Sequence, residues 1–150
     1  MPNEDVVSNF FSSYREHDYK GMHNALDEEI KFSDFAFDIQ GKEVRAMWQL
    51  FCSATEARPP VEVPWFEIVE SQADRVVAKY RVVYPFRDKT LLGERERKVD
   101  YVIEARLWLR NDKIVRHEDV SDIRAWARMA FGYPKCLIAG TAFFHDESFA

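Results

Sequence analysis

The chain has 150 residues, of which 47% are hydrophobic, 31% charged and 15% aromatic, and its formal net charge is -5. This composition predicts one soluble globular domain over residues 1–150, and the aromatic excess suits a large interior cavity or a wide sheet face. An acidic chain without an apolar run of roughly 20 residues argues against nucleic acid and membranes as partners. The polar N-terminus and the two distant cysteines, Cys52 and Cys136, favour a cytoplasmic protein with reduced thiols and no secretory signal.

Two helices are expected at the start of the chain. The first is capped by Asn3 or Asp5 and runs to about His17. Its apolar residues recur with the i, i+3, i+4, i+7 spacing of a helix and include Tyr14. A short second helix follows the break that ends at Gly21.

A strand and a third helix come next. Alternation over residues 30–37 puts Phe32 on an apolar face that Asp34 continues. A carboxylate in such a place is costly unless it is paired or functional. The helix over residues 42–54 has an apolar face that includes Trp48.

The second half is predicted to be a meander of four strands. Alternation indicates strands over residues 61–69 and 76–86, separated from the rest by a charged loop over residues 87–97. Two long strands then fill residues 99–121, and the turn at residues 110–113 joins them because Asn and Asp favour turns.

Ser121 is expected to cap a last helix that ends at Gly132, followed by a tail over residues 133–150. This order of elements predicts an α+β domain, with helices on one face of a curved antiparallel sheet.

Several short motifs resemble SnoaL-like bacterial proteins of the nuclear transport factor 2-like superfamily. They are Phe32-Ser33-Asp34, Gly41-Lys42-Glu43-Val44, Ala46-Met47-Trp48, Ile114-Val115-Arg116-His117 and residues 126–132. The resemblance covers about residues 4–132 and leaves 133–150 as a C-terminal extension. It implies a cone-shaped, cystatin-like fold with helices on the concave face, and a homodimer through the outer face of the sheet.

The resemblance also implies roles for single residues. Tyr14 is similar in placement to the helix-one tyrosine of ketosteroid isomerase, an oxyanion donor, and Asp34 to its general-base aspartate. Ten residues back from Ile114, Glu104 matches the second oxyanion donor. The stretch His117-Glu118-Asp119 resembles the His-x-Asp of SnoaL-like cyclases, whose aspartate is the supposed acid/base.

Alternation along the strand disagrees with one of these roles. It turns Tyr101 and Leu107 inward and Glu104 outward. Arg106 then lies on the same face as Glu104, which suits a solvated charge pair or an oligomer contact better than a proton donor.

A structural role competes with each functional one. Asp34 could bond backbone amides at the strand end, and Tyr14 could be a satisfied core tyrosine. His117 and Asp119 could be a hydrogen-bonded pair that stabilises the strand–helix junction. The aromatic residues that fill the core, or that line a pocket for a flat apolar ligand, are Phe32, Trp48, Trp65, Tyr80, Tyr84 and Trp126.

A carboxylate and an imidazole that face one apolar cavity suit acid/base chemistry on a carbonyl compound. We therefore expect a cofactor-free isomerase, cyclase, dehydratase or hydrolase acting on a small apolar carbonyl or hydroxy compound. Asp34 would be the base, and Tyr14 the oxyanion donor. His117 and Asp119 would be acid/base partner and orienter. The alternative is a non-catalytic ligand-binding or protein-interaction module, with its carboxylates held by amides or Arg residues. Four scattered histidines predict no metal site.

Overall fold

The computed structural model describes residues 1–56, 58–90 and 93–131, and this part of the chain forms a six-stranded sheet and four helices. The helices are α1 (Asn3–Arg15), α2 (Tyr19–Asn24), α3 (Lys42–Cys52) and α4 (Ile123–Phe131). In spatial order the strands are β2 (Asp38–Gln40), β1 (Leu26–Ser33), β6 (Lys113–Val120), β5 (Gly93–Arg110), β4 (Arg75–Thr90) and β3 (Phe66–Ser71). Neighbouring strands are antiparallel except β1 and β6, which run parallel.

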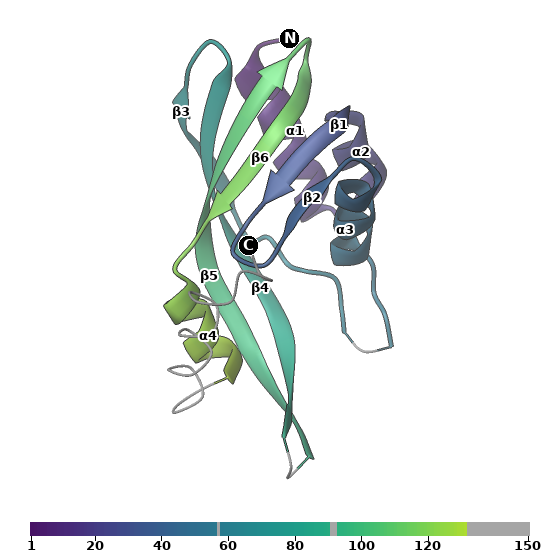
Figure 1. Ribbon diagram of the computed structural model, residues 1–150, viewed down its shortest axis with the longest axis vertical. Helices are drawn as coiled ribbons and strands as arrows, with labels where there is room; N and C mark the ends of the chain where they lie inside the picture. The colour runs from purple at the N-terminus through teal and green to yellow at the C-terminus, as the bar shows by residue number, and fades with distance from the viewer. Residues whose placement is uncertain (57, 91–92, 132–150) are drawn as a thin grey trace.

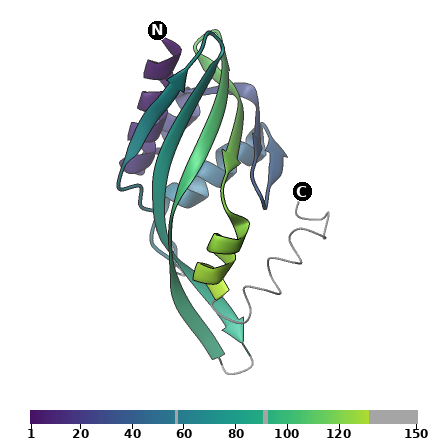
Figure 2. The same cartoon turned by 90° about the vertical axis from the view of Figure 1, so that its left-hand side faces the viewer.

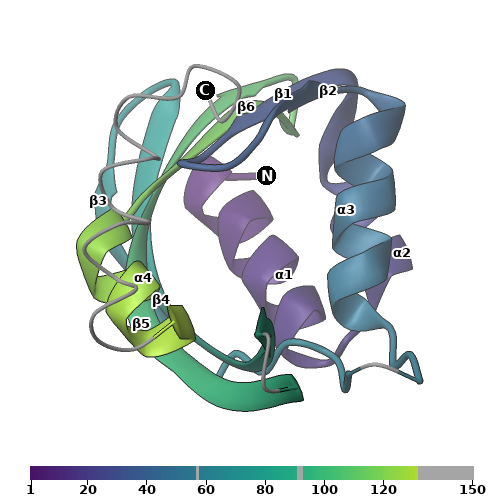
Figure 3. The same cartoon turned by 60° about the horizontal axis from the view of Figure 1, so that its bottom comes forward.

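The sheet is curved, and α1, α2 and α3 lie on its concave side (Figures 1 and 3). Figure 3 shows the sheet wrapping around α1, with α3 beyond that helix. The second half of β4 and the first half of β5 extend beyond the other strands as a two-stranded arm. Helix α4 packs against this arm (Figure 2). The α+β class and the concave placement of the helices are as the sequence predicts.

The hairpin between β5 and β6 follows from its turn residues. Asn111 and Asp112 have φ of 53° and 62°, the left-handed conformation that a two-residue hairpin needs at both positions. Asn and Asp tolerate this conformation better than other residues with a side chain. The predicted turn is therefore confirmed.

The helix caps differ from the prediction. Pro2 occupies the N-cap of α1 and has no side-chain acceptor to offer, and the Asn3 amide donates to the Ala73 carbonyl at 2.9 Å. At α4 the capping oxygen belongs to Asp122, which accepts from the backbone N–H of Arg124 and Ala125.

Two predicted boundaries are also wrong. The strand expected from residue 61 starts at Phe66, and before it only Glu62 forms a bridge, with Val83. A loop is expected over residues 87–97, but residues 87–90 and 93–97 belong to the strands of the arm, where Arg87 pairs with Glu96 and the pairing continues to Thr90 and Gly93. Strand β2, which alternation does not indicate, pairs with the end of β1.

Some predictions lie outside the described residues, namely the helix stop at Gly132, the thiol of Cys136 and the tail over residues 133–150. Cys52 is a free, buried thiol. None of the helices in the described part is long and apolar enough to cross a membrane.

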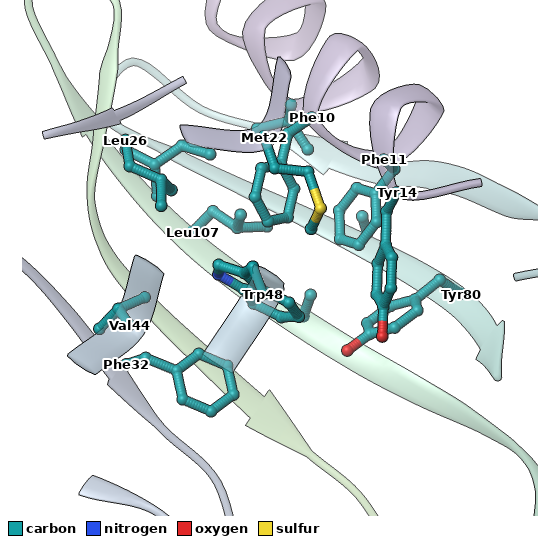
Figure 4. Packing of buried hydrophobic residues seen from close by; sticks show 14 of the residues in the cluster. Phe10, Phe11, Tyr14, Met22, Leu26, Phe32, Val44, Trp48, Tyr80 and Leu107 are labelled. Carbon is teal, nitrogen blue, oxygen red and sulfur yellow. The ribbon is translucent and has the colours of Figure 1, made fainter. Parts of the chain in front are cut away.

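The described core has two aromatic clusters. The larger lies between α1, α3 and the concave face of the sheet, where the Phe10, Trp48 and Tyr80 side chains meet (Figure 4). The smaller joins α4 to the arm, and in it Trp126 contacts Phe86 with ring centroids 5.5 Å apart. Burial of large aromatic side chains on both sides stabilises the arm against the body of the domain.

Candidate active site

A cavity of about 490 Å³ lies where the two aromatic clusters meet. Its volume is within the range of small-molecule sites, roughly 300–1,000 Å³. Most of its wall is aromatic or aliphatic, and Phe32, Trp48 and Trp126 are examples. The polar side chains that line it are Tyr14, Asp34, Arg58, Tyr80, Tyr84, Arg87, Tyr101 and Asp119.

An irregularity in β6 turns its titratable residues inward. Trp108 pairs with Arg116 and Leu109 with Ile114, so Val115 is an extra residue in the ladder. Strict alternation would put Ile114 and His117 on opposite faces, yet both are fully buried. The bulge therefore resets the strand and points His117 and Asp119 toward the concave side.

Asp119 is held by two hydrogen-bond donors below the cavity. Its Oδ2 accepts from the Tyr80 hydroxyl at 2.6 Å, and its Oδ1 lies 2.6 Å from Nε2 of His117. Among the described residues, Nδ1 of His117 has no hydrogen-bond partner. The tautomer with hydrogen on Nε2 fits this environment best, so His117 donates to Asp119.

His117 itself does not reach the cavity. Its ring is fully buried and stacks on Trp48 with centroids 5.6 Å apart, while Phe10 and Phe32 contact it edge-on. Asp119 lines the cavity in front of it. This geometry makes Asp119 the group that can meet a ligand and His117 the group that orients it.

Asp34 lies at the end of β1, in the tight turn that leads to β2. Its Oδ1 accepts from the backbone N–H of Ala36 at 2.8 Å and of Phe37 at 2.7 Å. Oδ2 accepts no hydrogen bond from the described residues, and the side chain lines the cavity. Burial raises the pKa of Asp34 from 3.8 to about 6, against the opposing effect of the two amide hydrogen bonds.

Tyrosine hydroxyls supply the other polar atoms of the wall. Burial raises the pKa of Tyr14, Tyr80, Tyr84 and Tyr101, so all four stay protonated and able to donate near neutral pH. Tyr84 accepts a hydrogen bond from Nε1 of Trp126 at 2.6 Å. The Tyr14 hydroxyl has no hydrogen-bond partner among the described residues and points to the same side as that of Tyr80 (Figure 4).

Two of the candidate residues lie elsewhere. Glu104 is on the opposite face of β5 from the cavity and accepts from Nε of Arg106 at 3.0 Å, as alternation indicates. The assignment of Glu104 by counting ten residues back from Ile114 is therefore wrong. Equal spacing along the chain does not ensure that two residues lie on the same face of a strand. Trp65 is 37% exposed and is not part of the cavity wall.

Several lining residues were not singled out from the sequence as site residues. Tyr101 continues the inward alternation of Ile103, so the strand pattern contained that signal. Arg58 lies in a loop and Arg87 lies in the arm. No local sequence pattern indicates where either segment lies relative to the cavity. Within the described residues, no three His, Cys, Asp or Glu side chains gather as metal ligands would.

No protein-family model and no curated protein matches the sequence, whereas solved structures do. A candidate SnoaL-like polyketide cyclase from Jannaschia sp. CCS1 is 16% identical, with 88% of this chain and 92% of that chain covered and a TM-score of 0.68. TerC, co-crystallised with polyporic acid, is 17% identical, with 87% and 98% covered and a TM-score of 0.65.

An LEH-like epoxide hydrolase from M. tuberculosis is 12% identical, with 93% of this chain and 92% of that chain covered and a TM-score of 0.62. Identities this low show a shared fold alone. The chain therefore has the fold of SnoaL-like and NTF2-like proteins, and the resemblance seen in its sequence is confirmed at that level.

Proposed function

We propose that this protein is a cofactor-free acid/base enzyme acting on a small, flat, apolar carbonyl or hydroxy compound. The observation that carries the proposal is the placement of two carboxyl groups, Asp34 and Asp119, on the wall of one largely aromatic cavity. Carboxyl groups kept apart from bulk water in different environments are suited to different protonation roles.

Asp34 is the proposed base. A pKa of about 6 leaves it ionised at neutral pH, yet close enough to that pH to accept a proton effectively. Its Oδ1 is held by Ala36 and Phe37, which fixes the carboxylate, while Oδ2 remains available to the ligand. In the proposed step Oδ2 takes a proton from the carbon beside a carbonyl, and the C–H electron pair moves into the resulting enolate.

Tyr14 is the proposed donor to the enolate oxygen, because its hydroxyl is free of other partners in the described structure. Asp119 is the proposed second acid/base group, which returns or relays a proton while His117 and Tyr80 keep its orientation. Among proteins of the same fold, TerC was crystallised with polyporic acid and another is an LEH-like epoxide hydrolase. These two proteins support small-molecule chemistry for the cavity.

Deuterium exchange tests the proposed proton abstraction directly. A panel of flat ketones and enones in heavy water is incubated with the protein, and exchange at carbons beside the carbonyl is followed by NMR. We expect catalysed exchange for at least one compound, and a fall of about 100-fold or more with Asp34→Asn. The matched control is Asp100→Asn, the same change on the outer face beside Arg81.

The non-catalytic alternative has its own support, since backbone amides already occupy Oδ1 of Asp34. It predicts that panel compounds bind, as shown by shifted His117 or Trp48 resonances, without any catalysed exchange. That outcome, or equal exchange by wild type and Asp34→Asn, would overturn the enzyme proposal.

A further inference from the structure

Arg58 is a cation fixed at the cavity wall by its own loop. It lies in the segment between α3 and β3, which runs from the end of α3 toward the sheet (Figure 3). Its backbone N–H donates to Oγ1 of Thr55 at 3.1 Å, and its carbonyl accepts from the Thr55 N–H at 2.8 Å. Pro59 and Pro60 follow and restrict the chain, so the start of the side chain is held in place.

Most N–H donors of the Arg58 guanidinium form no hydrogen bond within the described structure. Of its five N–H donors, one on Nη2 bonds the Leu50 carbonyl at 3.3 Å, and the group lies 5.7 Å from the centroid of the Phe51 ring. No carboxylate in the described structure forms an ion pair with Arg58. Arg87, the other cation of the wall, lies 3.9 Å from a carboxylate oxygen of Glu96.

Two hydroxyl donors accompany Arg58. The positive charge of Arg58 acts to lower the pKa of both Tyr14 and Tyr84, although burial raises each pKa overall. All three side chains line the same cavity. A carboxylate on a ligand in this cavity can accept two parallel N–H bonds from the guanidinium.

We propose that Arg58 receives a carboxylate of the ligand, so that the ligand class is a flat, apolar compound with one acidic substituent. The inference rests on the proposed function only for the cavity that both share. The reacting part of the ligand would lie at Asp34 and Asp119, and its permanent charge at Arg58. Arg58 is then a specificity residue and takes no part in proton transfer.

Matched acids and esters test this directly. Calorimetry measures binding of 2-naphthoate, anthracene-2-carboxylate and chromone-2-carboxylate, each beside its methyl ester. For wild type we expect at least one acid to bind about 10-fold or more tightly than its ester. Arg58→Gln should abolish that preference while leaving ester affinity within about 2-fold, and Arg58→Lys should restore only part of it, because Lys lacks the planar fork.

The control is Arg106→Gln, which removes the same charge from the outer face of the sheet and should keep the acid preference. Retained ester binding by Arg58→Gln excludes misfolding as the cause. The proposal is wrong if no acid binds better than its ester, or if Arg58→Gln keeps the preference. Acid preference without catalysed deuterium exchange would sustain this inference while the enzyme proposal fails.

Discussion

Asp119 and Glu104 lie on neighbouring strands of one sheet, and Asp119 is paired with Ala105, the residue next to Glu104. Asp119 faces the concave side, where Tyr80 and His117 hold both of its oxygens. Glu104 faces outward and forms an ion pair with Arg106. The Glu104 and Arg106 side chains are 34% and 39% exposed.

The two faces give the same functional group different consequences. On the inner face a carboxyl group depends on a few fixed partners, because water does not replace any that is removed. On the outer face water screens the charges and replaces lost bonds, so an ion pair there contributes little. Substitutions on the inner face should therefore cost more than equivalent substitutions on the outer face.

The largest effect is expected for His117→Ala. The substitution leaves a cavity beside Trp48 and removes a donor from Asp119, which should lower the free energy of unfolding by about 2–5 kcal/mol. Arg106→Ala should cost less than about 1 kcal/mol. Urea denaturation measures both, and His117→Phe separates lost packing from the lost hydrogen bond. Equal costs for the two alanine variants would contradict the comparison.

Asp34→Asn is expected to stabilise the protein in a pH-dependent manner. Because the pKa of Asp34 is about 6 in the folded protein and an unperturbed aspartate has 3.8, the folded state keeps a proton that the unfolded chain releases between these values. Stability contributed by Asp34 therefore falls as pH rises through this window, by at most about 3 kcal/mol. Asn keeps an acceptor for Ala36 and Phe37 but does not ionise.

The gain from Asp34→Asn should thus be absent near pH 3, small at about pH 4 and complete near pH 7, as measured by denaturation at a series of pH values. Asp100→Asn on the outer face should act in the opposite direction. Arg81 lowers the pKa of Asp100, so that carboxylate stabilises the fold at neutral pH and loses this effect on acidification. A gain from Asp34→Asn that stays undiminished down to about pH 3 would show another cause.

How far the sequence predicts these faces depends on the strand. In β5 the alternation alone places Tyr101 and Leu107 inward and Glu104 outward. It succeeds because this part of the strand is regular, with one face against the core and the other toward water. In β6 the bulge at Val115 arises from pairing with β5, so alternation alone misplaces His117 relative to Ile114. The resemblance gave the right side for His117 and Asp119 and the wrong one for Glu104.

The arm and the loops set the other limit. The sequence over residues 87–97 is mostly charged, so no hydrophobic period marks it, and residues 87–90 and 93–97 are strand residues through backbone pairing. The fold class followed from patterns within single elements. Arg58 joins the cavity only through tertiary packing, which no local pattern encodes.

Two tyrosines of the inner face differ in whether the hydroxyl has a hydrogen-bond partner. Tyr80→Phe removes a donor from Asp119 and should lower the free energy of unfolding by about 1–3 kcal/mol. Tyr14→Phe removes a hydroxyl without a partner in the described structure, and should change stability by less than about 0.5 kcal/mol. If the proposed function is right, Tyr14→Phe nonetheless slows deuterium exchange. A large loss of stability with Tyr14→Phe would mean that its hydroxyl is engaged.

The smallest effect is expected on the outer face. Glu104→Gln breaks one solvated ion pair and should change the free energy of unfolding by less than about 1 kcal/mol at low protein concentration.

The homodimer expected through this face would cover Glu104 together with Val102 and Val120, which are 45% and 43% exposed in the single chain. Stability of such a dimer depends on protein concentration, because association favours the folded state. Sedimentation of wild type and Val102→Glu therefore decides whether this face stays in water. A concentration-dependent dimer that Val102→Glu dissociates would give the outer carboxylate a buried environment like that of Asp119.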